Sequence, residues 1–125
     1  MKNNVLLVAG SRTITNYQRI AHILSNASYV HDVPFKLIIH GGAKGVDEAA
    51  GRWALERGYP VSVFHADWEL WGKSAGPERN RRMVDACTHG IVVWNGTSRG
   101  TAHTINLMRK ANKPLVVVYM TDGSD

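Results

Sequence analysis

Two glycine-rich segments of this 125-residue chain have the composition of anion-binding turns. Residues 41–45 read Gly-Gly-Ala-Lys-Gly, and residues 98–101 read Ser-Arg-Gly-Thr. Glycine lets the backbone approach a ligand closely, and the first amides of a following helix have no partner within that helix. Because the helix dipole is positive at the same end, each segment predicts a place for an anion such as phosphate. A tight turn with an ordinary helix cap is the alternative for either segment.

Arginines add concentrated positive charge to this chemistry. Pro77 is placed to open a helix, which puts Arg79 and Asn80 in the first turn of that helix. An arginine there opposes the helix dipole at a cost of about 0.5 kcal/mol, and a ligand-facing role would explain its presence. We expect Arg81 and Arg82 on the solvated face of the helix.

Carboxylates and indole rings supply the remaining candidate contacts. Asp47 and Glu48 fall in the first turn of the helix predicted after residues 41–45. Glu48 is typical of a carboxylate that complements the helix dipole, whereas Asp47 is a candidate acceptor for a ribose hydroxyl or an amino group. Trp68 and Trp71 lie in the longest predicted loop, where they either stack on a base or pack the loop onto the protein.

Five short apolar runs, bounded by turn residues, predict the strands that position these groups. They are rich in valine, isoleucine and leucine with little alternation, as expected for strands buried on both faces. Amphipathic stretches between them predict helices, so the chain is expected to form an α/β fold with a five-stranded parallel sheet between two helical layers. The predicted strands are residues 5–9, 37–40, 61–64, 91–94 and 115–119.

Parallel sheets of this kind bind ligands beyond the carboxyl ends of their strands. The first four predicted strands are each followed by a polar segment, and these four segments begin at Gly10, Gly41, Ala66 and Asn95. The topology therefore predicts that all four converge on one edge of the sheet.

Composition limits the class of protein. With 44% hydrophobic and 20% charged residues, the chain is predicted to form one domain over residues 1–120 and a loose tail over 121–125. Its net charge of +5 favours anionic partners such as nucleotides or nucleic acid. A single cysteine, Cys87, excludes an internal disulfide, and six scattered histidines predict no metal site. Short apolar runs and the lack of a leader pattern predict a cytoplasmic protein with no membrane contact.

Five motifs, in order along nearly the whole chain, resemble the YspA, or YpsA-related, branch of the SLOG superfamily. They are Val-Ala-Gly-Ser-Arg at 8–12, His-Gly-Gly-Ala-Lys-Gly-Val-Asp at 40–47, Ala-Asp-Trp at 66–68, Ala-Gly-Pro-Glu-Arg-Asn-Arg-Arg-Met at 75–83 and Ser-Arg-Gly-Thr at 98–101. The resemblance implies a compact Rossmann-like fold, a homo-oligomer of bacterial or phage origin, and a nucleotide or nucleotide-derived ligand.

The same superfamily contains LOG phosphoribohydrolases, which cleave a nucleoside monophosphate, and DprA proteins, which bind single-stranded DNA. Arg79 resembles the arginine of the LOG motif, although Asn80 stands where LOG enzymes have lysine. The position of their glutamate is Thr104 here, so the resemblance keeps the binding half of the motif without the catalytic carboxylate. Glu48 or Asp47 is the candidate replacement for that carboxylate.

We therefore predict a binding protein for a nucleotide or nucleotide-derived ligand, with no cofactor. The alternatives are a nucleotide N-glycosidase, for which Arg79, Glu48 and Asp47 are weak catalytic candidates, and single-stranded nucleic-acid binding of the DprA type. The predicted ligand-binding residues are Gly10, Ser11, Arg12, Gly41, Gly42, Ala43, Lys44, Gly45, Asp47, Asp67, Trp68, Arg79, Asn80, Ser98, Arg99, Gly100 and Thr101.

Overall fold

Strands and helices alternate through residues 3–121, the part of the chain that the computed structural model describes. The strands are β1 (Val5–Gly10), β2 (Leu37–His40), β3 (Val61–Val63), β4 (His89–Trp94) and β5 (Leu115–Tyr119). The helices are α1 (Tyr17–Ser25), α2 (Ala27–His31), α3 (Val46–Arg57), α4 (Trp68–Trp71), the 3₁₀ turn η1 (Gly72–Ser74), α5 (Ala75–Ala86) and α6 (Arg99–Lys110). The tail predicted at 121–125 lies, apart from Thr121, outside the described residues.

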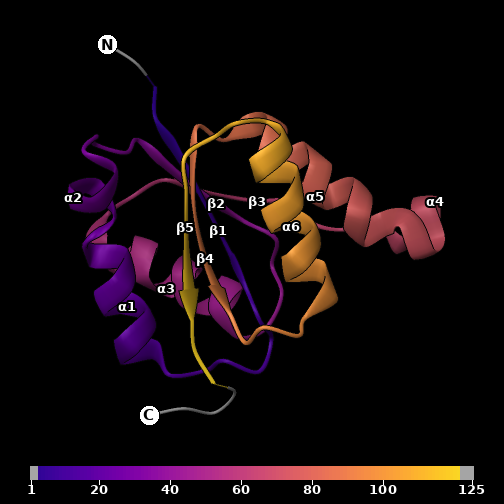
Figure 1. Cartoon of the computed structure of the whole chain (residues 1–125), viewed down its shortest axis with the longest axis horizontal. Coiled ribbons are helices and arrows are strands. Elements are labelled where there is room, and N and C mark those ends of the chain that lie inside the picture. Colours follow the sequence, from indigo (N-terminus) through magenta and orange to yellow (C-terminus); the bar gives the residue numbers. More distant parts are fainter. Residues whose placement is uncertain (1–2, 122–125) are drawn as a thin grey trace.

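The five strands form one parallel sheet in the order β3-β2-β1-β4-β5. Figure 1 shows the sheet edge-on between two helical layers, with α1, α2 and α3 on one side and α5 and α6 on the other. This three-layer Rossmann-like arrangement confirms the predicted fold class. Because β1 leads outward to β2 and β3 on one side, and β4 and β5 extend the other side, the strand order reverses between β1 and β4.

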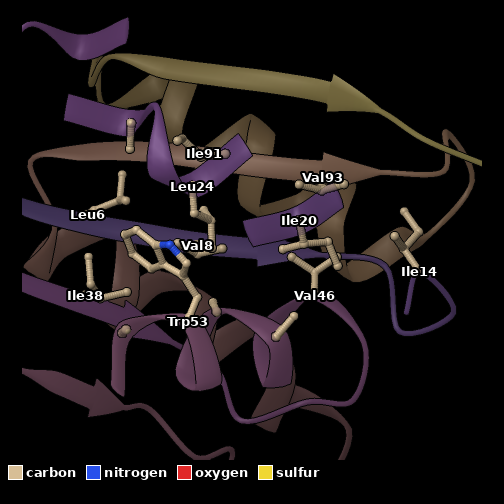
Figure 2. Close-up of a cluster of buried hydrophobic side chains, with 14 of the residues drawn as sticks. Leu6, Val8, Ile14, Ile20, Leu24, Ile38, Val46, Trp53, Ile91 and Val93 are labelled. Atoms are coloured by element: carbon tan, nitrogen blue, oxygen red, sulfur yellow. The ribbon is translucent and has the colours of Figure 1, made fainter. Parts of the chain in front are cut away.

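One apolar core fills the space between the sheet and the helices α1 and α3 (Figure 2). Alternate residues of the central strands, Leu6 and Val8 of β1 among them, point to this face and are fully buried. Trp53 of α3 packs into the same core, and its indole Nε1 donates a hydrogen bond to Ser25 Oγ at 3.1 Å. Successive side chains of a strand point to opposite faces of the sheet, so strands with an almost continuous hydrophobic sequence contribute to a core on each face.

A second core lies on the opposite face, where Leu7 of β1 packs against Met83 of α5 and Met108 of α6. Cys87, which directly follows α5, belongs to this core, and burial raises the pKa of its thiol to about 11. Nearby, Lys113 Nζ donates to three main-chain carbonyls at the end of α5, at 2.6 to 3.3 Å. A lysine at this point satisfies carbonyls that have no partner within the helix.

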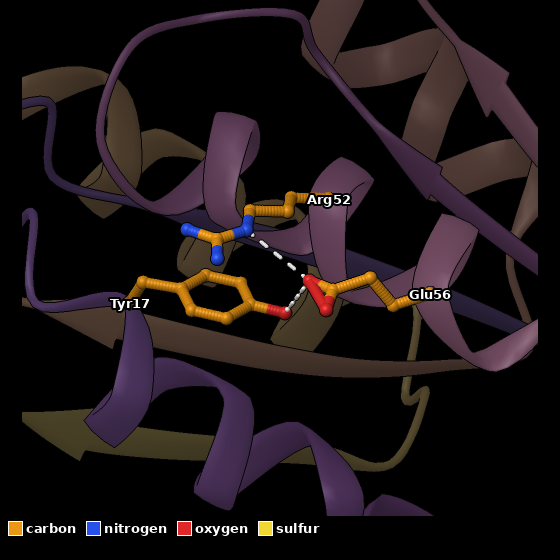
Figure 3. Close-up of polar contacts among 3 residues, drawn as sticks. All are labelled: Tyr17, Arg52 and Glu56. Atoms are coloured by element: carbon orange, nitrogen blue, oxygen red, sulfur yellow. Dashed lines mark hydrogen bonds and ion pairs between the residues drawn. The ribbon is translucent and has the colours of Figure 1, made fainter.

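An exposed cluster joins α1 to α3 at the surface (Figure 3). The hydroxyl of Tyr17 donates to Glu56 Oε1 at 2.6 Å, and Arg52 Nε donates to the same oxygen at 3.1 Å. The Arg52 guanidinium also lies 3.7 Å from the centre of the Tyr17 ring. Exposed pairs of this kind stabilise a protein only slightly, so the main attachment of α1 is its buried face.

The start of α5 differs from the prediction. The helix begins at Ala75, directly after η1, so Pro77 is its third residue and Arg79 its fifth. The prediction that Arg79 and Asn80 lie in the first turn was therefore wrong, and so was the argument from the helix dipole. Proline fits anywhere in a first turn because the amides there have no partner within the helix, so it did not mark the first position.

The segment predicted as the longest loop also contains helix. Trp68 and Trp71 are the first and last residues of α4, a helix of one turn. The Asp67 side chain starts this turn, because its Oδ1 accepts a hydrogen bond from the Leu70 amide at 3.0 Å. None of the helices in residues 3–121 combines the length and the hydrophobicity that a membrane span requires.

Gly10, the last residue of β1, lies in close contact with Val46, the first residue of α3, and with the backbone of β4. A Cβ atom there would lie 2.3 Å from the Val93 carbonyl oxygen and 2.6 Å from the Val46 side chain. We expect Gly10→Ala to lower the free energy of unfolding by about 2 to 3 kcal/mol, because a backbone oxygen cannot move aside without disturbing β4. Urea denaturation measures the change.

The matched control is Gly100→Ala in α6, where a Cβ atom would meet nothing within 4 Å. Alanine is the better helix former, so this variant should be unchanged or more stable by up to about 1 kcal/mol. Equal effects of the two substitutions would contradict the close-approach argument.

Candidate functional site

A cleft of about 380 Å³ opens at the carboxyl edge of the sheet. Ala9 and Gly10 at the end of β1 line it, together with residues from the first turns of α5 and α6. The cleft thus lies where the strand order reverses, which is the position at which open α/β sheets bind ligands. Its volume is in the range of small-molecule sites.

Most of the predicted ligand-binding residues line this cleft. They are Gly10, Arg12, Ala43, Asp47, Trp68, Arg79, Asn80, Ser98, Arg99, Gly100 and Thr101. The predicted residues that do not line it are Ser11, Gly41, Gly42, Lys44, Gly45 and Asp67. The structure therefore brings the α6 segment to the cleft and leaves most of the first glycine-rich segment behind it.

Ser11 and Gly45 do not line the cleft but pack the loops around it against one another. Ser11 is buried, and its Oγ accepts a hydrogen bond from the Asn95 amide at 3.0 Å, which links the loops after β1 and β4. Gly45 has φ +76°, and a Cβ atom there would lie 2.5 Å from the carbonyl oxygens of Ser11 and Arg12. Both residues are needed for packing, and Lys44 beside them is exposed to solvent.

Three amides of the first glycine-rich segment, those of Gly41, Gly42 and Ala43, already have partners within the protein. Asp47 Oδ2 accepts hydrogen bonds from the amides of Gly41, at 3.1 Å, and Ala43, at 3.2 Å. The Gly42 amide donates to His40 Nδ1 at 3.0 Å. A protein carboxylate therefore takes the place in this turn that an anionic ligand was expected to fill.

Asp47 itself is buried, with 6% of its surface exposed. Burial raises the pKa of its carboxyl to about 6, although the amides of Ala43 and Gly41 and the charges of Arg79 and Arg12 act in the opposite direction. Desolvation of the ionised form is thus the largest influence on this group.

Arg79 connects the same turn to α5. Its Nη1 donates to the Gly41 carbonyl at 2.6 Å, and its Nε donates to Asn80 Oδ1 at 3.0 Å. Burial lowers the pKa of Arg79 below its ordinary value, while the negative charge of Asp47 opposes that change. Glycine at position 41 leaves room for this contact, because a Cβ atom would lie 2.6 Å from Arg79 Nη1 and the arginine would have to shift.

Asn80 carries the connection on to α6. This buried side chain donates from Nδ2 to the Gly100 carbonyl at 3.3 Å and pairs with His103 Nδ1 at 3.2 Å. His103 lines the cleft, although no motif pointed to it. The signal was its spacing, because residues three and four positions after Gly100 share that residue's face of the helix.

The first turn of α6 differs from the first glycine-rich segment, because no side chain of the described residues caps it. Asn95 Oδ1 accepts from the amides of Thr97 and Ser98, each at 2.9 Å, which ends the loop just before the helix. The hydroxyls of Ser98 and Thr101 pair with each other at 3.0 Å. The amides that open α6 are therefore left to face the cleft.

The charges that line the cleft are mainly positive. Arg12, Arg79 and Arg99 contribute three guanidinium groups, and among the described lining residues Asp47 has the only carboxylate. Glu48 instead lines a small hollow beside Tyr17 and Arg52, away from this cleft. Residues 3–121 contain no group of three or more histidine, cysteine or acidic side chains that could hold a metal ion.

Comparison with known proteins agrees with this architecture. The sequence model of the YspA, cpYpsA-related SLOG family matches residues 4–71, which is more than half of the chain. The chain belongs to this family. The matched range contains β1, the first glycine-rich segment and α4, and it ends before α5 and α6.

Two similar proteins extend the comparison over most of the chain. Gene 61 protein of Mycobacterium phage D29 is 36% identical over 118 residues, covering 89% of this chain and 93% of the phage protein. The X-ray structure of DNA processing protein A (DprA) from Streptococcus pneumoniae has the same fold, with a TM-score of 0.74 at 18% identity. That match covers 92% of this chain and 50% of the DprA chain, so the SLOG chain spans about half of its length.

The buried carboxyl of Asp47 makes stability depend on pH. Its pKa is higher in the folded protein, about 6 against 3.8, so the folded state binds more protons than the unfolded state between these values. Its contribution to the free energy of unfolding therefore falls as the pH rises through this window. We expect the stability of the wild type relative to Asp47→Asn to decrease by about 2 kcal/mol from pH 4 to pH 7.

Urea unfolding at a series of pH values measures this difference, and asparagine keeps an acceptor for the two amides. Glu48→Gln is the matched control, because it removes the same charge from the next, exposed position of α3. A wild-type minus Asp47→Asn difference that stays constant with pH would contradict the assignment.

Proposed function

We propose that this SLOG protein binds a nucleotide or nucleotide-derived ligand in the cleft, with a phosphate at the first turn of α6. The main support is the uncapped N-terminus of this 12-residue helix, which faces the cleft together with three arginines. Unpaired amides and the positive end of the helix dipole favour an anion at this place. Guanidinium groups bind phosphate with bidentate geometry, as they do carboxylates.

The three arginines have different parts in this proposal. Arg12 and Arg99 are exposed and lie at the mouth of the cleft, where they can close on the phosphate. Arg79 is half-buried and already donates to the Gly41 carbonyl, so it would attract the phosphate by its positive charge without a direct hydrogen bond. This division assigns ligand recognition chiefly to Arg12 and Arg99.

The other end of the ligand would lie near Trp68 and Asp47. Trp68 lines the cleft with 57% of its surface exposed, so its ring is available to stack on a base. Trp71 lies in a neighbouring open hollow with Arg82 and does not line the cleft. The second carboxylate oxygen of Asp47 would accept a ribose hydroxyl or an amino group, since Oδ2 is occupied by the loop amides.

Ligand-induced stabilisation tests this proposal. At 100 times its dissociation constant, a bound nucleotide raises the free energy of unfolding by about 2.7 kcal/mol, which thermal denaturation detects. We expect Arg12→Ala to weaken nucleotide binding about tenfold or more, because it removes a charge-assisted hydrogen bond.

Arg109→Ala is the matched control, since it removes an exposed arginine at the far end of the same helix. It should leave the shift unchanged. The ligands tested include single-stranded oligonucleotides, because the fold is similar to that of a DNA processing protein. Their binding is measured over a series of salt concentrations, since binding to nucleic acid weakens steeply with salt. No shift with any nucleotide, or equal losses in both variants, would count against the proposal.

The N-glycosidase alternative has less support in the cleft. Thr104 stands at the position of the LOG glutamate, and its buried hydroxyl donates to the Gly100 carbonyl at 3.3 Å. Asp47 is the carboxylate that remains, and two amides hold one of its oxygens. We therefore expect nucleoside monophosphates to be recovered intact after incubation, as chromatography for free base would show. Base release that is lost in Asp47→Asn would instead establish an enzyme with Asp47 in its site.

A further inference from the structure

A chain of hydrogen bonds behind the cleft determines how the Asn80 amide is turned. The guanidinium Nε of Arg79 can only donate, and it lies 3.0 Å from Asn80 Oδ1. On the other side, the Gly100 carbonyl can only accept, and it lies 3.3 Å from Asn80 Nδ2. Both contacts are hydrogen bonds in this orientation of the amide. In the flipped orientation, two donors would face each other at Arg79 and two acceptors at Gly100. Asn80 therefore presents its NH₂ group toward α6.

This orientation determines the state of His103. Asn80 Nδ2 is a donor and lies 3.2 Å from His103 Nδ1, so Nδ1 must accept with its lone pair. A neutral imidazole that accepts at Nδ1 carries its proton on Nε2. Protonating both nitrogens would place two donors against each other at the Asn80 contact.

The surroundings of His103 favour the neutral ring. Burial lowers its pKa, and the positive charges of Arg81 and Lys110 on the solvent side lower it further. The ring lines the cleft one turn after Gly100. None of the described residues forms a hydrogen bond with its Nε2 atom.

We propose that His103 is a specificity-determining residue of the cleft, which presents a permanent Nε2–H donor to the ligand. This inference rests on the proposed function and names the part of the ligand that His103 meets: an oxygen that only accepts hydrogen bonds, such as a phosphate oxygen. The Nδ1 lone pair is occupied by Asn80, so His103 binds and does not act as a general base. It adds one more donor to those of Arg12, Arg99 and the first amides of α6.

Nuclear magnetic resonance reads the tautomer directly. Two-bond proton–nitrogen spectra of the full chain, labelled at histidine and assigned with His103→Gln, separate the two neutral forms. The expected result at pH 7.5 is His103 with its proton on Nε2 in the free protein, and a shift of this nitrogen when adenosine monophosphate is added. A proton on Nδ1 overturns the proposal.

Two substitutions of His103 test whether a donor at the position of Nε2 is required, or whether any polar side chain is enough. Glutamine places an NH₂ group near the position of Nε2, whereas asparagine reaches only the position of Nδ1. The dissociation constant for adenosine monophosphate should change less than about threefold in His103→Gln and rise about tenfold or more in His103→Asn. Thermal denaturation checks that both variants fold.

The outcomes distinguish this inference from the proposed function. If the wild type binds nucleotides and both variants bind equally well or equally poorly, the role of His103 is overturned and the binding function stands. If the wild type binds no phosphate-bearing ligand, the proposed function fails and the inference fails with it, whatever the tautomer. Tight binding in His103→Gln together with weak binding in His103→Asn supports both.

Discussion

The buried carboxylate of Asp47 is the interaction on which the rim of the sheet depends. It receives the amides of Gly41 and Ala43 from one side, while Arg79 holds the Gly41 carbonyl from the other. The loop after β2 is thus held between α3 and α5. A buried charge needs such partners, because an unpaired one is far more costly than a pair. Two layers that share no core are joined here by polar contacts, at the edge where the cleft forms.

The same network makes the two glycine-rich segments different. In the first segment the anion is built into the protein as Asp47, which occupies the amides of Gly41 and Ala43. The second segment opens α6 without a capping side chain. Asn80 links the two by joining the Arg79 side chain to the Gly100 carbonyl. Two sequence motifs of similar composition therefore differ in structure: a carboxylate of the protein occupies the first, and the second has no capping side chain.

The fold followed from sequence because hydrophobic runs identify buried parallel strands, and residues 37–40 and 115–119 were predicted with the observed bounds. The convergence of polar segments on one edge followed from topology alone. Contacts between side chains did not follow, because a sequence does not show that Asp47 turns back onto its own loop or that Asn80 reaches His103. The start of α5 was placed wrongly because proline is tolerated throughout a first turn. The homo-oligomer stays a prediction.

The position of β1 has a consequence for biosynthesis. This first strand is central, and its partner on one side, β4, is made only after residue 88. While the ribosome is still adding the middle of the chain, the β4-facing edge of β1 has unpaired main-chain groups, and Leu7 lacks later core neighbours such as Met108. Such an edge invites pairing with other nascent chains. The central sheet therefore cannot close until the second half of the chain is made, and β1 has to stay clear of other nascent chains until then.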